Sequence, residues 1–420
     1  MIPEVDARPA PVIIVGAAMG GLRTAEALRK AGYSGPLTVI GEEPHAPYNR
    51  PPLSKDVLSS EVSHQAVAFP QRPATADVDW MLGVRVASAS LVEKTVTTTD
   101  GMRHPFTALV IATGIRPRRV IPSGGEVQPA LPGRHTVRTL DDALALRREL
   151  VPGARVIVAG SGFIGCEVAA TARKLGCEVT VVSPSTLPII RPLGPVLAAE
   201  LQRRHEAHGV LFRLGRDIAV IEGTTSLTGI VLDDGSRLAA DVLVEAIGSD
   251  CNVEWLVGTG LDLTDGVLAD SAMRAVGLDG KAHDDVFVVG DIARFPNALF
   301  DEIPRRVEHW NIPTDTGKRA GAVLGARLSR PVTHDVNVDS PFQTAVAQPF
   351  TPMPAFWSNQ FEVSIQAYGL PGLADSIRQL EGDLAADCIY GYYRGSTLVG
   401  VVGLGMKAAL LPYRQLIATH

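Results

Sequence analysis

The sequence predicts an α/β protein with two parallel-sheet domains and a small α+β domain at its C-terminal end. Three observations predict this class. A short β-branched run enters a glycine-rich turn at Gly16, and the same pattern recurs at Gly160. From about residue 330 the chain shifts to prolines, an aromatic cluster and alternating strand-like runs. Short apolar runs without alternation are typical of parallel strands buried on both faces.

Each glycine-rich turn belongs to a complete β-α-β unit. A helical stretch follows each turn, at residues 21–31 and 165–175, and a glycine closes it. A second apolar strand comes next, at residues 37–40 and 178–182. In such a unit the glycines permit the tight turn, the approach of backbone to a pyrophosphate and the packing of helix on strand. The free N–H groups at the helix N-terminus then bind the anion.

One such turn is weak evidence, but two complete units predict two Rossmann-like, dinucleotide-binding domains. The first turn carries Ala18 where a middle glycine is usual, and a methyl group still fits there. The second turn is intact. The turn residues expected at the nucleotides are Gly16, Ala18, Gly20 and Gly21 in the first unit, and Gly160, Gly162, Phe163, Ile164 and Gly165 in the second.

Later strand ends extend the two candidate sites. Glu42, with Glu43 beside it, ends the second strand of the first unit, where a carboxylate accepts adenosine ribose hydroxyls. A strand at residues 286–289 runs into Gly290 and Asp291, whose carboxylate suits a ribityl hydroxyl. Each unit is expected to end with a similar apolar strand followed by a turn of small residues. In the first unit this turn contains Ala112, Thr113 and Gly114, and in the second it contains Ile247 and Gly248.

Two irregular stretches lie between these elements. Three prolines stiffen residues 47–55 into a shaped loop, because proline fixes φ and removes a donor. Within it, Ser54 is expected to cap a following helix, and spacing alone makes Lys55 a surface lysine. Short strands and turns follow, with a hairpin signal at Asp100 and Gly101.

The bulk composition narrows the function classes. The chain has 420 residues, enough for two to three domains, with 39 Lys and Arg against 45 Asp and Glu and a net charge of −6. This balance argues against nucleic acid as a partner. The longest apolar stretch near the end, residues 397–406, is about half a membrane helix, and no signal peptide is visible, so a cytoplasmic protein is expected. The cysteines are too widely spaced for a disulfide framework or a zinc site: Cys166, Cys177, Cys251 and Cys388.

Together these residues resemble the FAD-containing ferredoxin reductases of bacterial oxygenase systems. The most specific phrases are R-P-P-L-S-K at residues 50–55, G-S-G-F-I-G-C-E at 160–167 and F-W-S-N-Q at 356–360. Residues 138–143 and 308–310 also match. The resemblance implies a glutathione-reductase-like organisation. Its domains would be an FAD-binding domain of residues 1–118 and 249–329, an NAD(P)H-binding domain of residues 119–248 and a C-terminal α+β domain of residues 330–420.

The resemblance also implies roles for individual residues. Lys55 and Glu167 would pair near flavin N5, where a lysine charge stabilises the reduced flavin and a buried ammonium needs a carboxylate partner. The other residues assigned to FAD are Glu42, Arg50, Val86, Arg138, Gly290, Asp291, Glu308, His309, Trp310 and Trp357, with the first turn and residues 112–114. Those assigned to NAD(P)H are Glu167, Ser183, Arg191, Ile247 and Gly248, with the second turn.

The choice between NADH and NADPH stays open at this point. Family members that use NADH usually end the second strand of this unit with an acidic residue, which takes both ribose hydroxyls. Here Ser183 occupies that end, so a 2′-phosphate is not repelled, and Ser183 and Ser185 are donors for it. Arg191 is an available counter-charge.

The resemblance implies electron transfer from NAD(P)H through FAD to a small [2Fe–2S] ferredoxin that serves a cytochrome P450 or Rieske-type oxygenase. An NAD(P)H oxidase and a flavin-based redox-sensing binding protein are the alternatives. A disulfide reductase is rejected, because no closely spaced cysteine pair exists. Monomer and dimer are both open. Basic residues that could face an acidic ferredoxin are Arg305, Arg306, Lys318 and Arg319.

Overall fold

The computed structural model describes residues 11–122, 131–328 and 340–419. Within these ranges the chain forms two compact units, and each is discontinuous in sequence. The first unit contains the described parts of Met1–Asn49, Ala68–Ile115 and Cys251–Pro354. The second contains the described parts of Arg50–Val67, Arg116–Asp250 and Ala355–His420. The domain limits expected from the resemblance stay predictions.

A six-stranded sheet in the order β19-β20-β7-β1-β2-β3 forms the core of the first unit. Strand β1 lies parallel between β2 and β7, with Val12 opposite both Leu37 and Ala108. All residues of β1 and β7 are buried, as the apolar runs predicted. The strands of this sheet are β1 (Val12–Val15), β2 (Leu37–Gly41), β3 (Asp79–Leu82), β7 (Ala108–Ile111), β19 (Arg274–Val276) and β20 (Ala282–Val288).

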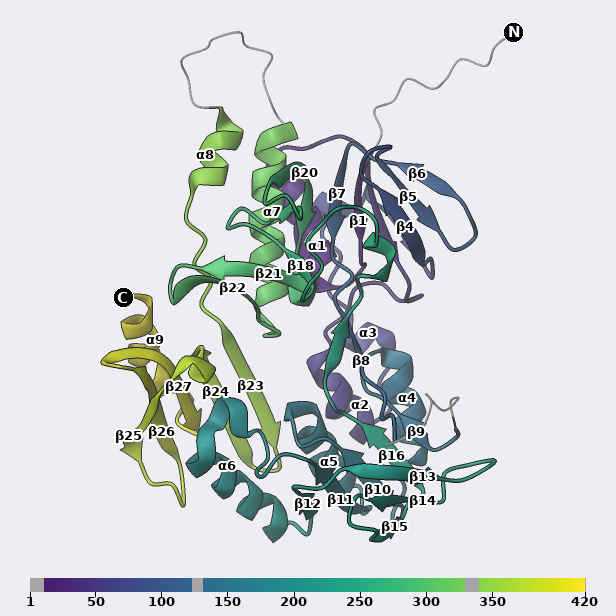
Figure 1. The fold of residues 1–420 in the computed structure, drawn as a ribbon, viewed down its shortest axis with the longest axis vertical. Coiled ribbons are helices and arrows are strands. Elements are labelled where there is room, and N and C mark those ends of the chain that lie inside the picture. The colour runs from purple at the N-terminus through teal and green to yellow at the C-terminus, as the bar shows by residue number, and fades with distance from the viewer. Residues whose placement is uncertain (1–10, 123–130, 329–339, 420) are drawn as a thin grey trace. The chain divides into compact units, whose positions relative to one another are not determined.

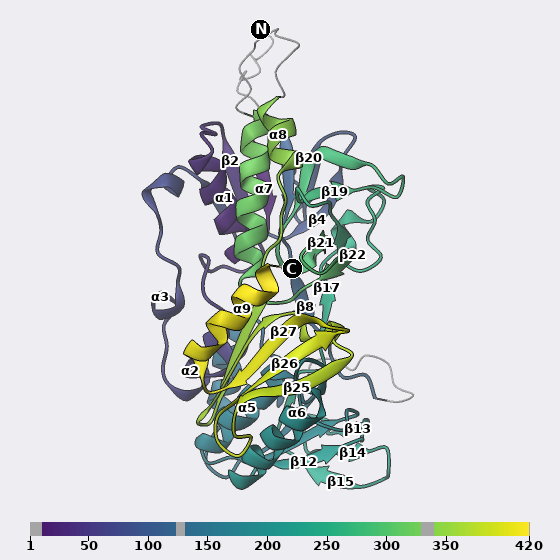
Figure 2. The same ribbon diagram turned by 90° about the vertical axis from the view of Figure 1, so that its left-hand side faces the viewer.

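Helices α1 (Met19–Lys30) and α7 (Ile312–Leu328) run side by side in both ribbon views (Figure 1 and Figure 2). Glycines spaced four residues apart on α7 face α1. A Cβ added to Gly321 would lie 2.5 Å from the Cβ of Ala27, and one added to Gly325 would lie 2.4 Å from that of Ala31. The small residues therefore let the two helix backbones approach closely.

Smaller sheets complete the first unit. Strands β5 and β6 form the hairpin expected at Gly101, which has a φ of +86°. The three-stranded sheets are β4 (Val86–Ser90), β5 (Thr95–Thr98) and β6 (Arg103–Pro105), and β18 (Val267–Leu268), β21 (Ala293–Asn297) and β22 (Asp301–Arg306). Short helices are η2 (Pro73–Thr75), η3 (Glu254–Leu256), η4 (Gly290–Ile292) and α8 (Pro341–Ala347).

The second unit repeats the parallel plan with a five-stranded sheet in the order β12-β11-β10-β16-β9. All four neighbouring pairs are parallel. Its strands are β9 (Arg134–His135), β10 (Arg155–Ala159), β11 (Glu178–Ser183), β12 (Leu211–Leu214) and β16 (Val242–Glu245). Its helices are α4 (Leu140–Glu149), α5 (Phe163–Lys174) and α6 (Ile190–Ala207).

Further short elements lie in the second unit or where the chain passes between the two units. The proline-rich loop forms η1 (Pro51–Ser54), α2 (Asp56–Ser59) and α3 (His64–Val67). Strands β8 (Ile115–Pro117) and β17 (Ser249–Cys251) pair, and β13 (Ile218–Glu222), β14 (Gly229–Leu232) and β15 (Arg237–Ala239) form an antiparallel sheet. The expectation that Ser54 caps a helix is wrong. Helix α2 begins after Lys55 without a side-chain cap, and the hydroxyl of Ser54 donates to Glu167.

An antiparallel sheet in the order β23-β24-β27-β26-β25 and a terminal helix also belong to the second unit. Alternating strands and a helical tail were expected here, and both are present. The elements are β23 (Ala355–Gln360), β24 (Val363–Gly369), η5 (Pro371–Leu373), β25 (Ser376–Gly382), β26 (Cys388–Arg394), β27 (Thr397–Leu404), η6 (Lys407–Leu410) and α9 (Leu411–Ala418).

The close approach of α1 and α7 makes a stability prediction. We expect Gly321→Ala to lower the free energy of unfolding by about 1 to 2 kcal/mol, because overpacking outweighs the gain in helix propensity. Denaturant unfolding of the FAD-loaded protein measures this change. Gly372→Ala is the control, since no atom lies within 4 Å of a Cβ added there. Equal stability of Gly321→Ala and the parent protein would contradict the packing argument.

Candidate functional site

The first glycine turn lies at the carboxyl end of β1. Gly16 has a φ of +123°, and a Cβ there would lie 2.1 Å from the carbonyl oxygen of Ala112. Helix α1 follows with Ala18 as its N-cap, without a side-chain cap or an acidic residue in its first turn. Its first backbone N–H groups are therefore available to an anion. This geometry fits the pyrophosphate of a dinucleotide.

The second turn repeats this geometry at the end of β10. Gly160 has a φ of +101°, and a Cβ there would lie 2.3 Å from the carbonyl oxygen of Ala246. A Cβ on Gly162 would meet no atom within 4 Å, so the backbone borders open space. Helix α5 also starts without a side-chain cap or an acidic first turn. The second unit therefore fits a second dinucleotide.

Several sequence-predicted residues of the first unit meet at one edge of its sheet. Strands β1, β7 and β20 are adjacent and parallel, so their carboxyl ends lie together. A Cβ on Gly20 would lie 3.3 Å from Val289, and Gly20 and Gly290 both neighbour Pro313. The first turn, residues 112–114, Gly290 and Asp291 thus share one edge, the usual ligand position in parallel sheets.

The remaining FAD candidates of the first unit have defined contacts. The Glu42 side chain is 68% exposed and lies 3.5 Å from Arg85, whereas Glu43 accepts a hydrogen bond from the Tyr48 hydroxyl. Val86 is buried in β4. The indole of Trp310 donates to Asn49, and Glu308 accepts from Arg306. Removal from water lowers the pKa of His309 to about 4, so its ring is neutral at neutral pH.

The remaining candidates of the second unit are spread over several elements. Arg50 donates to the carbonyl of Arg138, whose own N–H donates to Asp142 in the capping box of α4. The rings of Phe163 and Phe356 pack with centroids 4.9 Å apart. Ile164, Ile247 and Trp357 are large apolar side chains that stay exposed, Arg191 lies in the first turn of α6, and Gly248 has a φ of +102°.

The end of β11 is more closed than the sequence suggested. Ser183 is buried, and its hydroxyl oxygen accepts the N–H of Ser185 at 3.3 Å. The carbonyl of Ser183 accepts the N–H of Arg216. The Arg216 guanidinium lies 3.1 Å from Asp234 and 3.8 Å from Asp233. The positive charge of Arg216 is therefore already balanced by carboxylates.

A buried carboxylate gathers the catalytic candidates of the second unit. Glu167 on α5 is 4% exposed, and its Oε2 lies 2.6 Å from the Nζ of Lys55. The hydroxyl of Ser54 donates to Oε2 at 2.5 Å, and that of Ser358 donates to Oε1 at 2.5 Å. The predicted Lys55–Glu167 ion pair is thus present. The two serines were missed as Glu167 ligands, although both stand inside the matched R-P-P-L-S-K and F-W-S-N-Q phrases.

Buried hydrogen bonds continue from Ser358 to Gln360 and His205. The amide of Gln360 donates to the Ser358 hydroxyl at 2.9 Å, and its oxygen lies 2.7 Å from Nε2 of His205. His205 is fully buried near the end of α6. Burial lowers the pKa of His205 from its ordinary 6.5 to about 4, although the Gln360 contact opposes this shift. The imidazole is therefore neutral in the folded protein at neutral pH.

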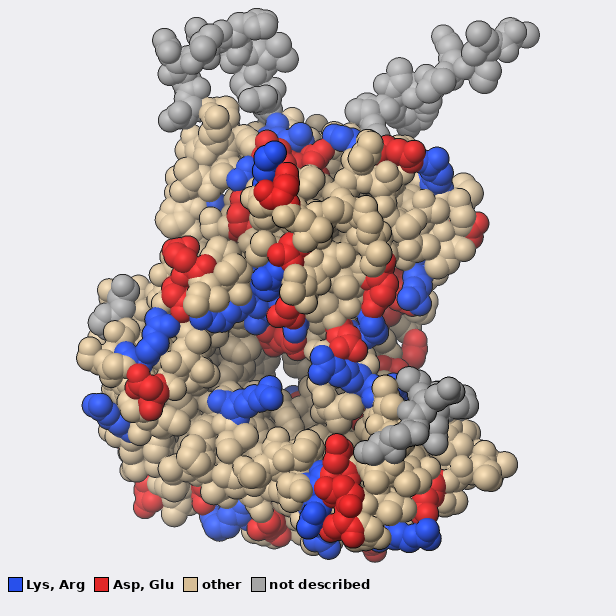
Figure 3. Space-filling model, viewed as in Figure 1, with Lys and Arg blue, Asp and Glu red and all other residues tan. Residues whose placement is uncertain are grey.

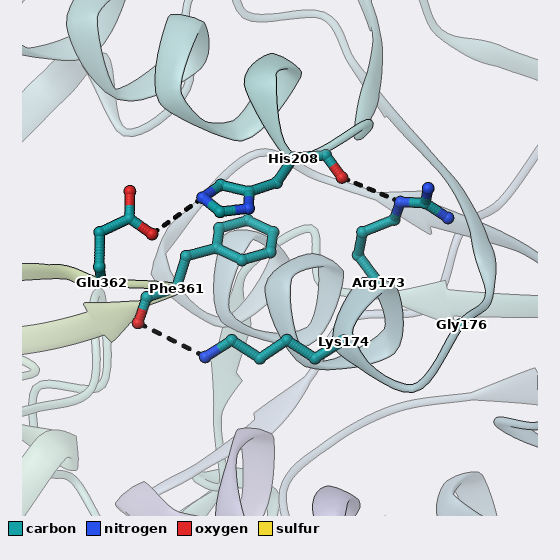
Figure 4. Close-up of a pocket in the computed structure, with 6 residues that line it drawn as sticks. All are labelled: Arg173, Lys174, Gly176, His208, Phe361 and Glu362. Carbon is teal, nitrogen blue, oxygen red and sulfur yellow. Dashed lines mark hydrogen bonds and ion pairs between the residues drawn. The ribbon is translucent and has the colours of Figure 1, made fainter.

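A cavity of about 520 Å³ lies on the second unit, where the β23–β24 hairpin meets the ends of α5 and α6 (Figure 4). The ring of His208 stacks on Phe361 with centroids 4.0 Å apart, and its Nε2 lies 2.8 Å from Glu362. The Nζ of Lys174 lies 3.4 Å from the Phe361 carbonyl. The lining residues are Arg173, Lys174, Gly176, His208, Phe361 and Glu362, and none of them was a site prediction.

The described ranges contain neither a candidate metal cluster nor a candidate membrane span. Across residues 11–122, 131–328 and 340–419, no cluster of three or more His, Cys, Asp or Glu side chains is arranged to hold a metal. In the same ranges, no helix is long and apolar enough to cross a membrane. All four cysteines are free thiols.

Known proteins share this arrangement. The sequence pattern described as pyridine nucleotide-disulphide oxidoreductase matches residues 10–317, and a reductase C-terminal pattern matches residues 355–420. The chain is 34% identical over 414 residues to the anthranilate 1,2-dioxygenase system ferredoxin–NAD(+) reductase component of Burkholderia cepacia, covering 97% of this chain and 94% of that protein. It is 30% identical over 420 residues to rhodocoxin reductase of Rhodococcus erythropolis, with coverages of 97% and 90%.

A solved structure of the covalent putidaredoxin reductase–putidaredoxin complex matches with a TM-score of 0.86 and 28% identity, over 98% of this chain and 94% of that chain. Fold and glycine turns thus define an oxidoreductase with two dinucleotide-binding domains. The chain belongs to the pyridine nucleotide-disulphide oxidoreductase family. The family and fold class expected from the sequence are confirmed, and this membership implies FAD and NAD(H).

The depressed pKa of His205 predicts an acid-dependent loss of stability. The folded state binds this proton more weakly than the unfolded state, so protonation favours unfolding. The contribution of His205 is fully present above pH 6.5 and is lost as the pH falls towards 4, by about 3 kcal/mol in total. We expect His205→Gln to flatten this part of the curve in urea unfolding of the FAD-loaded protein between pH 4 and 8. Parallel curves for the two proteins would contradict the assignment.

Proposed function

We propose that this protein passes electrons from NADH through FAD to a small [2Fe–2S] ferredoxin that serves an oxygenase. The observation that carries the proposal is two dinucleotide-binding turns in one chain that is similar over nearly its full length to ferredoxin–NAD(+) reductases. The relatives are named for anthranilate dioxygenase and rhodocoxin systems, and one match is bound to its putidaredoxin. Since NADH is a cytoplasmic cosubstrate, a cytoplasmic location is part of the proposal.

In this proposal the first unit binds FAD. The N-terminus of α1 binds the pyrophosphate, Glu42 accepts ribose hydroxyls and Asp291 accepts a ribityl hydroxyl. The exposed carboxylate of Glu42 suits this role better than Glu43, whose oxygen already accepts the Tyr48 hydroxyl. FAD supplies the ability to take a hydride and to release its two electrons singly. The N-terminus of α5 binds the pyrophosphate of the nicotinamide nucleotide.

The Lys55–Glu167 pair is proposed to act at the flavin. Lys55 would present a fixed positive charge where hydride transfer adds electron density, and Glu167 holds that charge in place. The Lys55 side chain is 19% exposed and that of Glu167 is 4% exposed, so the lysine is partly and the carboxylate almost completely withdrawn from water. A charge that is positioned in advance requires little rearrangement during the reaction. No separate acid–base residue is needed for a hydride transfer.

NADH is proposed as the donor on physical grounds and on the relatives' names. The Ser183 hydroxyl is buried and its oxygen accepts a backbone hydrogen bond. The Arg216 guanidinium is paired with Asp233 and Asp234, whose charges oppose a 2′-phosphate. Several relatives are named as NAD(+) reductases. These observations favour the unphosphorylated ribose.

Three of the four basic residues suggested for ferredoxin docking have partners within the first unit. Arg305 pairs with Asp301, and Arg306 pairs with Asp265 and Glu308. Arg319 donates to backbone carbonyls, and burial lowers its pKa. On the face shown in Figure 3, basic and acidic side chains are interspersed. Steering of an acidic ferredoxin by these three arginines is therefore not part of the proposal.

The two alternatives differ in their electron acceptor. An NAD(P)H oxidase reduces oxygen, and it needs fast reoxidation of the flavin by oxygen. A redox sensor turns over slowly with every acceptor and changes a partner surface instead. Similarity to named ferredoxin reductases over 97% of the chain favours the reductase.

Anaerobic bleaching of the flavin absorption band tests the donor. We expect NADH to bleach the band rapidly and NADPH to bleach it at least about tenfold more slowly at equal concentration, because the carboxylates near Arg216 repel the extra phosphate. Faster bleaching by NADPH would overturn the choice of donor. Slow bleaching by both would favour the sensor.

The ion pair is tested by Lys55→Met and Glu167→Gln. We expect both to slow bleaching at saturating NADH by about 10- to 100-fold, because a charge near the reacting atoms is removed or released. The dissociation constant for NADH should change much less. Stopped-flow absorbance with FAD-loaded protein separates the two quantities. Arg203→Met, which removes an exposed arginine that pairs with the buried Glu200, is a matched loss of an ion pair elsewhere in the second unit and should keep the parent rate.

A further inference from the structure

The Glu167 carboxylate is held from two sides by separate parts of the second unit. Its Oε2 accepts from Ser54 and pairs with Lys55, both in the loop formed by residues 50–67. Its Oε1 accepts from Ser358 on β23, at 2.5 Å. All of these partners except Lys55 are buried. The two oxygens of the Glu167 carboxylate therefore have different partners: Oε2 contacts Ser54 and Lys55, and Oε1 contacts Ser358.

The donors on the Oε1 side all point towards Glu167. The oxygen of Gln360 faces His205, so Nε2 of His205 carries the proton that it donates. The amide nitrogen of Gln360 donates to Ser358, and the Ser358 hydroxyl is then left to donate to Glu167. This order follows from the hydrogen-bonding capacity of each group. Turning any one group round would place two donors or two acceptors together.

The hairpin that carries Ser358 and Gln360 is anchored at its tip. The turn between β23 and β24 contains Phe361 at a φ of +54°, an uncommon conformation for a bulky side chain. The stacked ring of His208 and the Lys174 side chain hold Phe361 there (Figure 4). The hairpin tip is therefore clamped to the ends of α5 and α6, and the ring of Phe361 also packs edge-on against that of the buried His205, with centroids 5.1 Å apart.

Glu167 needs this second attachment because Lys55 has another partner. The Lys55 ammonium also lies 3.2 Å from the carbonyl of Pro51. A glutamate with only one oxygen held is able to turn about its side-chain torsions, and Lys55 would then follow or settle on Pro51. With Oε1 fixed by Ser358, Oε2 remains directed at Lys55.

We propose that Ser358 and Gln360 are positioning residues that hold Glu167 in the orientation in which it pairs with Lys55. In this proposal His205 holds Gln360 in place through their hydrogen bond. The inference rests on the proposed function, in which the Lys55–Glu167 pair serves hydride transfer. It assigns to β23 of the C-terminal sheet a part in orienting the Lys55–Glu167 pair.

The test uses Ser358→Ala, Gln360→Met and His205→Phe in FAD-loaded protein. We expect each to slow anaerobic bleaching by saturating NADH, by about tenfold for the two nearest residues and less for His205, with little change in the dissociation constant for NADH. The midpoint potential of FAD should move in the same direction as in Lys55→Met. A purely structural role would lower the melting temperature without moving this potential.

Two controls belong to the same experiment. Ser358→Thr keeps the hydroxyl and should restore most of the rate. Glu362→Gln breaks the ion pair at the hairpin tip and leaves the buried hydrogen bonds of Ser358 and Gln360 in place, so it should keep the parent rate and potential. If Gln360→Met fails to hold FAD, Ser358→Ala, which removes a single oxygen atom, still carries the test.

A double-mutant comparison decides whether Ser358 and Gln360 act through Glu167. In the Glu167→Gln background, Gln360→Met and Ser358→Ala should add no further slowing, because their target is already changed. Full additivity would overturn the inference, as would single variants with the parent rate and potential. Slow bleaching of the parent protein, or an unchanged rate in Lys55→Met, would instead overturn the proposed function, and the inference with it.

Discussion

The tight backbone turn at the end of a buried parallel strand is the constraint on which both units depend. In each unit a carbonyl oxygen of the neighbouring strand end occupies the position of a Cβ, Ala112 against Gly16 and Ala246 against Gly160. Only glycine allows this contact, and so only glycine allows the strands to end side by side with a helix starting between them. The uncapped helix N-termini and the clustered strand ends are consequences of the same geometry.

Local pattern predicted the elements well because each pattern is complete within about thirty residues. The strand at residues 12–15 and the hairpin at Gly101 have the positions expected. The buried polar cluster could not be predicted in this way, since Ser54 and Ser358 lie 113 and 191 residues from Glu167 in sequence. Serine is also a preferred N-cap residue, which is why a helix cap was expected at Ser54. A buried carboxylate competes more strongly for its hydroxyl than an exposed helix start does.

The same limit applies to charge. Sequence shows that Arg305, Arg306 and Arg319 are basic, but whether a guanidinium faces a partner protein or a neighbouring strand depends on tertiary packing. Here their partners lie within the first unit. Ser183 is a similar case, because a strand end that looks open in sequence has its hydroxyl turned inward. The assignment of individual residues to FAD and NADH remains a set of predictions from the resemblance.

The interleaving of the two units has a consequence for synthesis on the ribosome. The small-residue face of α1 is covered only after α7, some three hundred residues later, has been synthesised. Likewise, Glu167 gains its hydrogen bond from Ser358 only after β23 has been synthesised. Neither unit is able to close until most of the chain has emerged, so the nascent protein exposes apolar surface and a half-satisfied carboxylate for much of its elongation. Chains that stop before residue 355 would lack the Ser358 hydroxyl and the whole C-terminal sheet. Premature termination therefore yields fragments suited to chaperone binding and proteolysis rather than a working half-enzyme.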